Sequence, residues 1–311
     1  MNSRTKGIFL GIIVGLAWGL DSTLMGTIEA HPLVSAFFHD SFAFMWIGLT
    51  LMLSKQFLGS IKLLSTKKGK ATAVAALVGA PVGMSAYLLA IKYATTPYAS
   101  SISVIYPGIG ALLSFLILKE KLSKRAALGI FVSLLGSFML SFKPTGDIPD
   151  TFGTGILFAL LAVLGWASEG VIIGFAMKHI KDEDHVQATP QQFLCLRYFI
   201  SMLIYGILII PVSDNIQPAL QILKNGVYLK FAGIAILGAI TYLCWYKAVN
   251  LIGAAMGTAL NSTAALWTIV FSILLFNNSV NFHLIIWGLV IVIGVFIFAI
   301  EPKKAKEEAS C

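Results

Sequence analysis

Charged residues are scarce in this sequence. Only 12% of its 311 residues are Asp, Glu, Lys or Arg, whereas 58% are hydrophobic and the mean hydropathy is +0.87. Soluble globular domains typically carry about 25% charged residues, so this composition excludes a soluble globule. The sequence predicts an integral membrane protein, whose net charge of +8 reflects orientation in the bilayer. No nucleic-acid partner is expected.

Cysteines and cofactor motifs are scarce too. Cys195, Cys244 and Cys311 are odd in number and have no metal-ligand spacing with the five histidines, which argues against disulfides and a zinc site. The sequence has no phosphate-binding loop of the Gly-x-x-x-x-Gly-Lys-Ser/Thr type, so it does not resemble an ATP-driven pump. No cofactor or metal is expected, and no spacing of nucleophile and base favours an intramembrane enzyme.

Long apolar runs dominate the sequence instead. Ten of them have the length of about 18–25 residues that crosses a hydrocarbon core of about 30 Å. The runs are continuous rather than alternating, which indicates helices and not barrel strands. We therefore predict an all-α integral membrane fold with ten transmembrane helices, near residues 7–26, 33–54, 71–91, 98–118, 125–142, 153–177, 191–212, 228–248, 254–276 and 282–300.

Basic residues are distributed unequally between the two sides of these spans. Seventeen Lys and Arg residues fall on the side of the N-terminus and four on the opposite side, while Arg197 lies inside the seventh span. Cytoplasmic loops carry the excess of Lys and Arg in membrane proteins. Both termini are therefore expected in the cytoplasm.

Two halves of the sequence resemble each other. Trp18-Gly-Leu-Asp21 recurs 148 residues later as Trp166-Ala-Ser-Glu169, and Tyr87 recurs 155 residues later as Tyr242, with matching neighbours. Each half has five expected spans, an odd number, so the second half should enter the membrane in the opposite direction. Inverted repeats are typical of transporters that hold their substrate near the midplane. The expected units are residues 1–144 and 151–301, each a five-helix repeat, followed by a cytoplasmic tail at 302–311.

Ionisable side chains within the spans indicate a polar site. Each costs about 2.5–3.5 kcal/mol at the bilayer centre, and the candidates are Asp21, Asp40, Glu169 and Arg197, with His39 beside Asp40. Trp18 precedes Asp21 by three residues, as Trp166 precedes Glu169, so each ring shares a helix face with a carboxylate. Aromatic faces and carboxylates favour a cation. The alternative is that the tryptophans pack between helices and the acids bond to Ser, Thr or backbone.

Specific roles follow for these residues. The predicted substrate-binding set is Trp18, Asp21, Tyr87, Trp166, Glu169 and Tyr242, and the predicted gating or coupling set is His39, Asp40 and Arg197. Arg197 is expected to pair with an acid or with helix-end carbonyls. Asp21 and Glu169 are expected to lie close together, so that one of them holds a proton when the site is empty. Protons are thus a candidate coupling ion.

Small residues and prolines are expected to shape the helices. Gly7, Gly11, Gly15 and Gly19 form a seam at four-residue spacing, which permits close helix approach. Pro81 and Pro107 should bend or interrupt the third and fourth spans and free carbonyl groups where they can line a cavity.

These stretches resemble the drug/metabolite transporter superfamily, with two EamA-type repeats over almost the whole chain. Pro107 followed thirteen residues later by Glu120 is typical of the first repeat, whereas Ser262, Asn277 and Asn278 stand at the corresponding places of the second. Within the superfamily the sequence is similar to bacterial choline permeases. The matching stretches are Trp18-Gly, His39-Asp40, Gly79-Ala-Pro-Val-Gly-Met84, residues 99–107, Ser168-Glu169, residues 175–177 and Leu196-Arg197.

The resemblance implies a secondary transporter of a small organic cation in the bacterial plasma membrane, with choline uptake by alternating access as its activity. Asp21 stands where a glycine is expected in choline permeases and Tyr87 where an asparagine is expected. Export of amino acids or toxic cations is the alternative within the superfamily. The direction of transport, the coupling ion and the oligomeric state stay open at this point.

Overall fold

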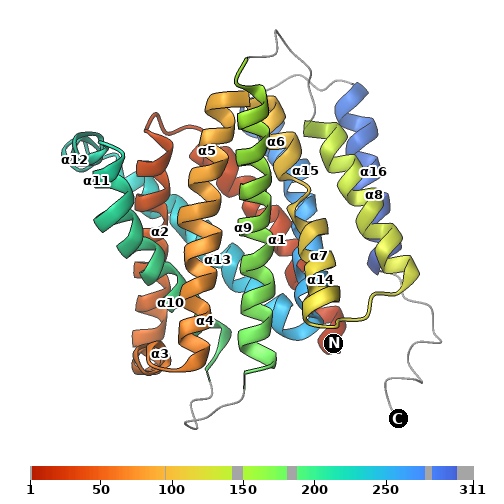
Figure 1. Ribbon diagram of the computed structural model, residues 1–311, viewed down its shortest axis with the longest axis horizontal. Coiled ribbons are helices and arrows are strands. Elements are labelled where there is room, and N and C mark those ends of the chain that lie inside the picture. Colours follow the sequence, from red (N-terminus) through yellow and green to blue (C-terminus); the bar gives the residue numbers. More distant parts are fainter. Residues whose placement is uncertain (1, 95, 142–149, 181–187, 277–281, 300–311) are drawn as a thin grey trace.

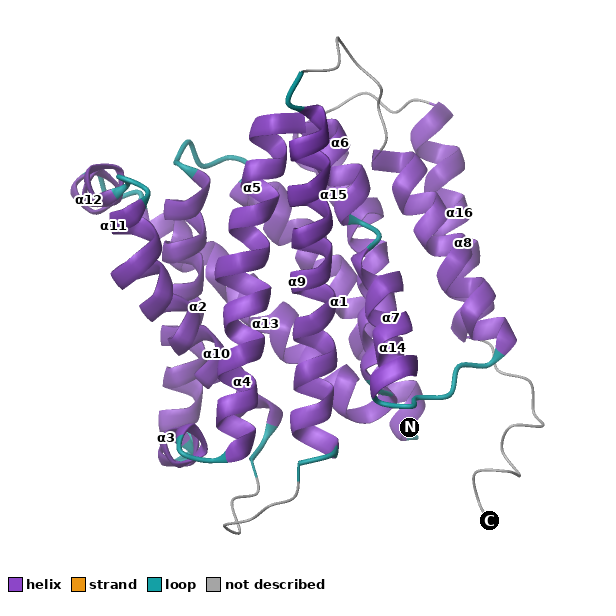
Figure 2. Ribbon diagram, viewed as in Figure 1, coloured by secondary structure: helices purple, strands orange, loops and turns teal. Residues whose placement is uncertain are grey.

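The computed structural model describes residues 2–94, 96–141, 150–180, 188–276 and 282–299. Within these ranges all regular secondary structure is helical (Figure 2). The expected tail at 302–311, most of the linker between the halves, and Asn277 and Asn278 lie outside the described residues.

The described part of the first half contains eight helices and one π-helical turn. Proline residues begin or interrupt several of them, since proline has no backbone N–H and suits the first turn of a helix. The elements are α1 (Ser3–Met25), α2 (Pro32–Leu53), α3 (Phe57–Leu64), α4 (Lys67–Leu77), the π turn η1 (Val78–Val82), α5 (Gly83–Ala94), α6 (Thr96–Ser103), α7 (Tyr106–Ile117) and α8 (Lys124–Ser141).

The second half likewise consists of long helices with short interruptions between them. Thr189 starts α10 with a reciprocal capping box to Gln192. The elements are α9 (Phe152–Lys178), α10 (Pro190–Ile204), the π turn η2 (Tyr205–Ile209), α11 (Ile210–Val212), α12 (Ile216–Lys224), α13 (Tyr228–Ile252), α14 (Ala254–Ala259), the 3₁₀ turn η3 (Leu260–Thr263), α15 (Ala264–Phe276) and α16 (Phe282–Ala299).

Each of the ten apolar runs is mainly helical where the structure describes it, and a turn at residues 104–105 divides the fourth. Seven helical stretches in the described part of the chain are long and apolar enough to cross a membrane. Two shorter apolar helices, Tyr106–Ile117 and Ile285–Ile297, lie within the fourth and tenth expected spans. The short helices α3 and α12, which the apolar pattern did not predict, lie at opposite ends of the bundle (Figure 1).

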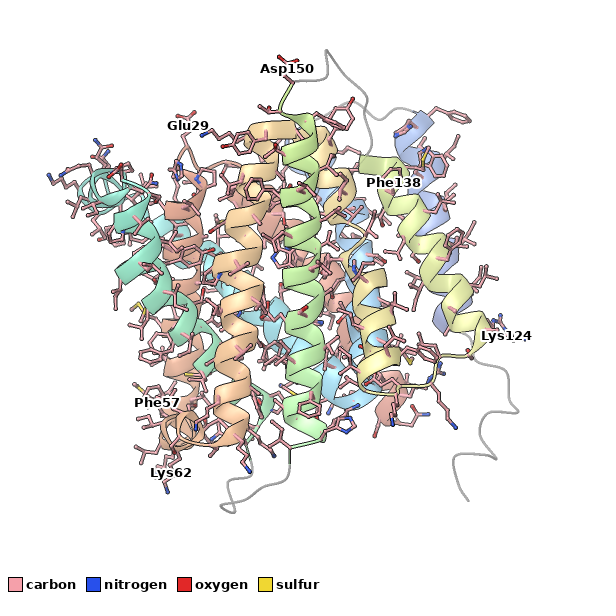
Figure 3. The ribbon with its side chains drawn as sticks, viewed as in Figure 1. Glu29, Phe57, Lys62, Lys124, Phe138 and Asp150 are labelled. Atoms are coloured by element: carbon pink, nitrogen blue, oxygen red, sulfur yellow. The ribbon has the colours of Figure 1, made fainter. Side chains whose placement is uncertain are left out.

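The helices form one bundle with two distinct ends (Figure 1). The N-terminus lies at the same end as Lys62 and Lys124, whereas Glu29 and Asp150 lie at the opposite end (Figure 3). Helix α1 therefore runs from the N-terminal end toward Glu29, while α9 begins beside Asp150 and runs the other way. The first helices of the two halves enter the bundle in opposite directions, as inverted repeats require.

The glycine seam of α1 joins this helix to the second half. Gly7, Gly11, Gly15 and Gly19 are buried, and a β-carbon at these positions would collide in turn with Ile252, Leu260, Thr263 and Trp267. Helix α1 consequently lies directly against α13, η3 and α15. The close approach expected from the four-residue spacing is confirmed, and it brings Trp18 and Asp21 next to the second repeat.

A second contact between the halves involves Glu120. Its two carboxylate oxygens accept hydrogen bonds of 3.0 Å from the backbone N–H groups of Ala254 and Ala255. These are the first N–H groups of α14, which have no partner within the helix, and a carboxylate is favoured at the positive end of the helix dipole. The glutamate after the fourth span thus stabilises the helix that begins the ninth.

Helices α8 and α16 pack mainly on each other at one edge of the bundle (Figure 1). None of their described residues lines the cavity presented below. The candidate site is therefore built from the other eight expected spans.

Candidate functional site

A cavity of about 1180 Å³ lies between the two halves. Helices of both repeats line it, including α1, α2, α5 and α7 from the first and α9, α13 and α15 from the second. It reaches Gly26, Ile28 and Ala30 in the connection from α1 to α2, and Ile273 near the end of α15. The cavity therefore extends toward the end of the bundle that carries Glu29.

Helix interruptions supply part of the lining. Pro81 lies inside the π turn η1, and the carbonyl of Ala80 in that turn accepts a hydrogen bond of 3.1 Å from the Tyr205 hydroxyl. The 3₁₀ turn η3 interrupts the ninth span, where the carbonyl of Ser262 accepts a hydrogen bond of 2.9 Å from the Ser137 hydroxyl. Irregular backbone at membrane depth is tolerated where it is buried in protein or lines a cavity. The interruptions expected near Pro81 and Pro107 are present, as η1 and as the turn at residues 104–105 before α7, whereas the break at Ser262 occurs without proline.

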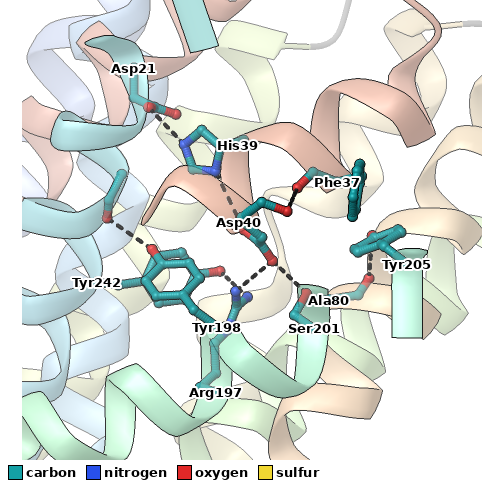
Figure 4. Close-up of polar contacts among 12 residues, drawn as sticks. Asp21, Phe37, His39, Asp40, Ala80, Arg197, Tyr198, Ser201, Tyr205 and Tyr242 are labelled. Atoms are coloured by element: carbon teal, nitrogen blue, oxygen red, sulfur yellow. Dashed lines mark hydrogen bonds and ion pairs between the residues drawn. The ribbon is translucent and has the colours of Figure 1, made fainter. Parts of the chain in front are cut away.

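Five ionisable side chains form a continuous network beside the cavity, and Figure 4 shows Asp21, His39, Asp40 and Arg197 of this network. His39 lies between two acids, with Nε2 3.1 Å from Asp21 Oδ1 and Nδ1 3.4 Å from Asp40 Oδ1. Arg197 continues the network, since Nη1 donates to Asp40 Oδ2 at 2.8 Å and Nε donates to Glu169 Oε1 at 3.0 Å. The four links connect α1, α2, α9 and α10.

Neighbouring hydroxyl groups complete this network. Ser201 donates a 2.5 Å hydrogen bond to Asp40, and Tyr246 donates a 3.4 Å bond to Glu169. Arg197 Nη2 donates to the Tyr242 hydroxyl at 2.8 Å. Arg197 is 2% exposed and Glu169 1% exposed, so these charges depend on each other and not on solvent for their stabilisation.

Two glycines create the space that this network needs. A β-carbon at Gly79 would overlap the Glu169 carboxylate, and a β-carbon at Gly238 would overlap the His39 ring. Glu169 and His39 therefore lie directly against the backbone of η1 and α13. A side chain at either glycine would displace the charged group.

The network has an excess of negative charge. Its three carboxylates face one guanidinium, which leaves a formal charge of −2 with a neutral His39 imidazole and −1 with an imidazolium. Uncompensated charge is costly in a low-dielectric interior. A cavity lined by these groups is therefore suited to a positively charged occupant.

Aromatic rings surround the charged groups in two clusters. Trp18 contacts Tyr242 at a centroid distance of 5.3 Å, and Trp166 contacts Tyr87 at 5.4 Å. Tyr242 also has the Arg197 guanidinium 4.3 Å from its ring centroid. The Tyr242 ring therefore already contacts a cation of the protein, the Arg197 guanidinium. Tyr242 thus helps to orient Arg197.

All nine residues predicted from the sequence line the cavity: Trp18, Asp21, His39, Asp40, Tyr87, Trp166, Glu169, Arg197 and Tyr242. Arg197 pairs with acids inside the bundle, as expected. Asp21 and Glu169 do not pair with each other, because Asp21 bonds to His39 and Glu169 bonds to Arg197. The expectation that they form one close carboxylate pair is wrong, since His39, Asp40 and Arg197 intervene.

Some lining residues were not identified from the sequence. They include Asn261, which lies in η3 and donates a 2.9 Å hydrogen bond from Nδ2 to the Tyr106 hydroxyl. Asn261 follows Tyr106 by 155 residues, the same offset that relates Tyr87 to Tyr242. The repeat therefore contained a signal for this residue, although an amide replaces the ring.

Comparison with known proteins gives consistent results. The sequence profile of the EamA-like transporter family matches residues 5–142 and 153–300, one match in each half. The chain is 30% identical over 302 residues to Protein LicB of Haemophilus influenzae, a match that covers 94% of this chain and 97% of that protein. It is 25% identical over 259 residues to an uncharacterized transporter of Clostridium kluyveri, with 80% of each chain covered.

Similarity also extends to a solved protein crystal structure. That structure superposes on 94% of this chain with a TM-score of 0.71 and is itself covered to 96%. The two sequences are 14% identical, so the likeness concerns the fold alone.

Proposed function

Because the chain belongs to the EamA-like transporter family, we propose that it imports a small organic cation, most specifically choline, by alternating access around the central cavity. Family membership makes the chain a multi-pass membrane transporter of a small molecule and not an enzyme. The choice of cargo, the direction and the coupling are the proposed parts.

The excess of carboxylate in the cavity is the observation that carries this proposal. Glu169, Asp40 and Asp21 outnumber Arg197 as fixed charges, so a cation entering the cavity compensates charge that the protein leaves unbalanced. A carboxylate-bearing cargo without net positive charge does not offer this compensation. The charge balance therefore favours an organic cation over an amino acid.

Aromatic lining favours a quaternary ammonium group in particular. Trp18, Tyr87 and Trp166 are the proposed walls of the site, because aromatic faces bind ammonium groups without requiring N–H donors, at about 0.5–2 kcal/mol per contact. Asp21 and Glu169 are the proposed counter-charges. The resemblance of the sequence to bacterial choline permeases supports choline within this class.

The membrane arrangement that we propose has ten spans in two inverted repeats, at residues 1–144 and 151–301, with both termini in the cytoplasm. The clustering of Lys62, Lys124 and the N-terminus at one end of the bundle supports this orientation (Figures 1 and 3). The cavity then extends toward the outside, the side from which an importer takes up its cargo.

Uptake of labelled choline into proteoliposomes that contain the purified chain tests the proposal. We expect saturable uptake that ethanolamine inhibits weakly and that amino acids do not inhibit. Betaine and carnitine, whose carboxylates cancel the ammonium charge, should compete poorly. Saturable transport of an amino acid without choline uptake would refute the proposal in favour of the exporter alternative.

Replacement of Trp166 tests the aromatic wall. Trp166→Ala should weaken choline binding about five- to thirtyfold, which corresponds to about 1–2 kcal/mol, while Trp166→Phe should lose less because it keeps an aromatic face. Binding is measured by calorimetry on purified protein. Trp287→Ala in the peripheral helix α16 is the matched control and should bind choline normally. Equal losses in both Trp166 variants, with poor folding yield, would indicate a packing role.

Coupling to protons is the remaining part of the proposal, and it centres on His39. A cation that enters beside Asp21 adds positive charge next to the imidazole, which disfavours the imidazolium. Choline binding by the wild type should therefore release protons, which a pH indicator detects in weakly buffered solution. Asp21→Asn removes the carboxylate that stabilises the imidazolium, so choline binding by this variant should release fewer protons. Asp150→Asn changes an exposed residue and should release as many protons as the wild type. Equal proton release by Asp21→Asn and Asp150→Asn would show that Asp21 and His39 do not take part in proton coupling.

A further inference from the structure

Asn261 occupies a special place in the cavity wall. It lies in η3, where the ninth span is interrupted, and its repeat counterpart Tyr106 begins α7 just after the interruption of the fourth span. The two residues bond to each other through Asn261 Nδ2 and the Tyr106 hydroxyl at 2.9 Å. Both line the cavity, so the two helix breaks meet there.

Within the described residues, the Asn261 side chain forms a hydrogen bond through its amide nitrogen but not through its oxygen. The side chain is buried, with 3% of the residue exposed, and its Oδ1 has no hydrogen-bond partner among the described residues. An unpaired buried acceptor is unfavourable, because it has lost its hydrogen bonds to water without gaining others. The bond to Tyr106 orients this amide, and Asn261 is one of the residues that line the cavity.

Other polar groups of the same turn are satisfied within the protein. Ser262 donates to the Ala259 carbonyl at 2.8 Å, and Thr263 donates to the Leu260 carbonyl at 2.9 Å. Thr258, just before the turn, accepts a 3.3 Å hydrogen bond from the Trp245 indole. Asn261 is thus distinguished from its neighbours by an acceptor that no donor in the described part of the chain reaches.

The surroundings connect Asn261 to the proposed cation site. The Tyr106 ring meets Trp166 edge-on at a centroid distance of 5.7 Å. Glu169 follows Trp166 by three residues on α9, hence on the same helix face. Trp166, Tyr106 and Asn261 are therefore linked by successive contacts along the cavity wall, beside the proposed site of the ammonium group.

Building on the proposed function, we propose that Asn261 Oδ1 accepts a hydrogen bond from the hydroxyl group of an amino-alcohol cation. The carboxylates and rings bind the ammonium end, and Asn261, held by Tyr106, binds the hydroxyl end. The site then selects a cation with a donor two carbons from nitrogen and discriminates against cations of the same size that lack this donor. Asn261 is a specificity-determining residue in this assignment.

Two ligands that differ only in the donor test the inference. Choline and propyltrimethylammonium have the same charge and nearly the same shape, with a methyl group in place of the hydroxyl. The purified full chain should bind choline about tenfold more tightly, as expected for a buried hydrogen bond worth about 1.4 kcal/mol. Asn261→Leu should weaken choline binding about tenfold and leave propyltrimethylammonium unchanged, so that the two affinities become equal.

Variants nearby separate recognition from folding. Ser262→Ala changes another buried residue of the same turn whose hydroxyl already bonds to backbone, and it should keep the tenfold preference. Tyr106→Phe removes the bond that holds the amide and should reduce the preference without abolishing it. If Asn261→Leu does not fold, Tyr106→Phe and Ser262→Ala decide the question: a reduced preference in Tyr106→Phe alone supports the role of Asn261, and an unchanged preference in Tyr106→Phe overturns it.

Each outcome has a defined meaning. Equal affinity of the wild type for both ligands would overturn the role of Asn261 while leaving choline binding intact. A tenfold preference that persists in Asn261→Leu would also overturn it, because the hydroxyl then bonds elsewhere. Failure of the wild type to bind either ligand would refute the proposed function itself and, with it, the inference.

Discussion

Glu169→Gln should weaken binding of choline about a hundredfold. Glutamine keeps an acceptor for Arg197 Nε and for the Tyr246 hydroxyl, which lie 3.0 and 3.4 Å from Glu169 Oε1, so the substitution removes charge with little change of shape. A unit charge about 6 Å from the ammonium group contributes roughly 2.8 kcal/mol at an effective dielectric constant of about 20, or about a hundredfold in affinity. Calorimetry on purified protein measures the loss.

Glu29→Gln is the matched control for this change. Glu29 is exposed at the end of the bundle and does not line the cavity, so its variant should bind choline like the wild type. The thermal stability of the Glu169 variant must be measured in parallel, because its partner Arg197 keeps its charge in a buried setting. Normal affinity in a well-folded Glu169→Gln protein would show that this carboxylate does not face the cargo.

Arg197→Leu should destabilise the protein more than any other single change in the network. The guanidinium donates hydrogen bonds to Asp40, Glu169 and Tyr242 from three different nitrogens. Its removal leaves two buried carboxylates without their counter-charge, and breaking a buried ion pair in this way typically costs about 3–5 kcal/mol. A large fall in melting temperature in detergent, with loss of choline binding, is the expected result.

A second substitution tests whether the Asp40 carboxylate depends on Arg197 for its stabilisation. The double variant Arg197→Leu/Asp40→Asn should recover part of the lost stability, because it removes one of the two carboxylates left unpaired. Arg125→Leu makes the same change at an exposed position of α8 and should leave the melting temperature near that of the wild type. A stable Arg197→Leu protein would contradict the network, since it would mean that the acids do not require the guanidinium.

The same network explains how a membrane-embedded site carries several charges. Asp40 has three partners, namely Arg197, His39 and the Ser201 hydroxyl. Charges within a membrane span are tolerated when they face the bundle interior and pair with one another. Because Arg197 neutralises part of the carboxylate charge, only the excess negative charge is available to a cargo. The site therefore suits a cation with a low charge.

Much of the fold followed from the order of residues alone. Hydrophobic runs predict spanning helices because, in lipid, each backbone group must be bonded within its own helix, which makes this signal local. The repeated Trp-x-x-acid pairs predicted two opposed halves, and the structure brings Trp18, Asp21, Trp166 and Glu169 to one cavity. The four-residue glycine spacing of α1 likewise predicted a contact surface, because close packing requires small residues on one helix face.

Partner choice inside the cavity could not be predicted in this way. Arg197 bonds to acids 28 and 157 residues away, and Asn261 bonds to Tyr106 across 155 residues. Helical periodicity determines which face a side chain occupies, but the packing of helices from both halves determines which opposing group it meets. The tertiary structure alone therefore paired Asp21 with His39 and Glu169 with Arg197. It also left Asn261 Oδ1 without a partner within the described chain, because no donor on the adjacent helices reaches it.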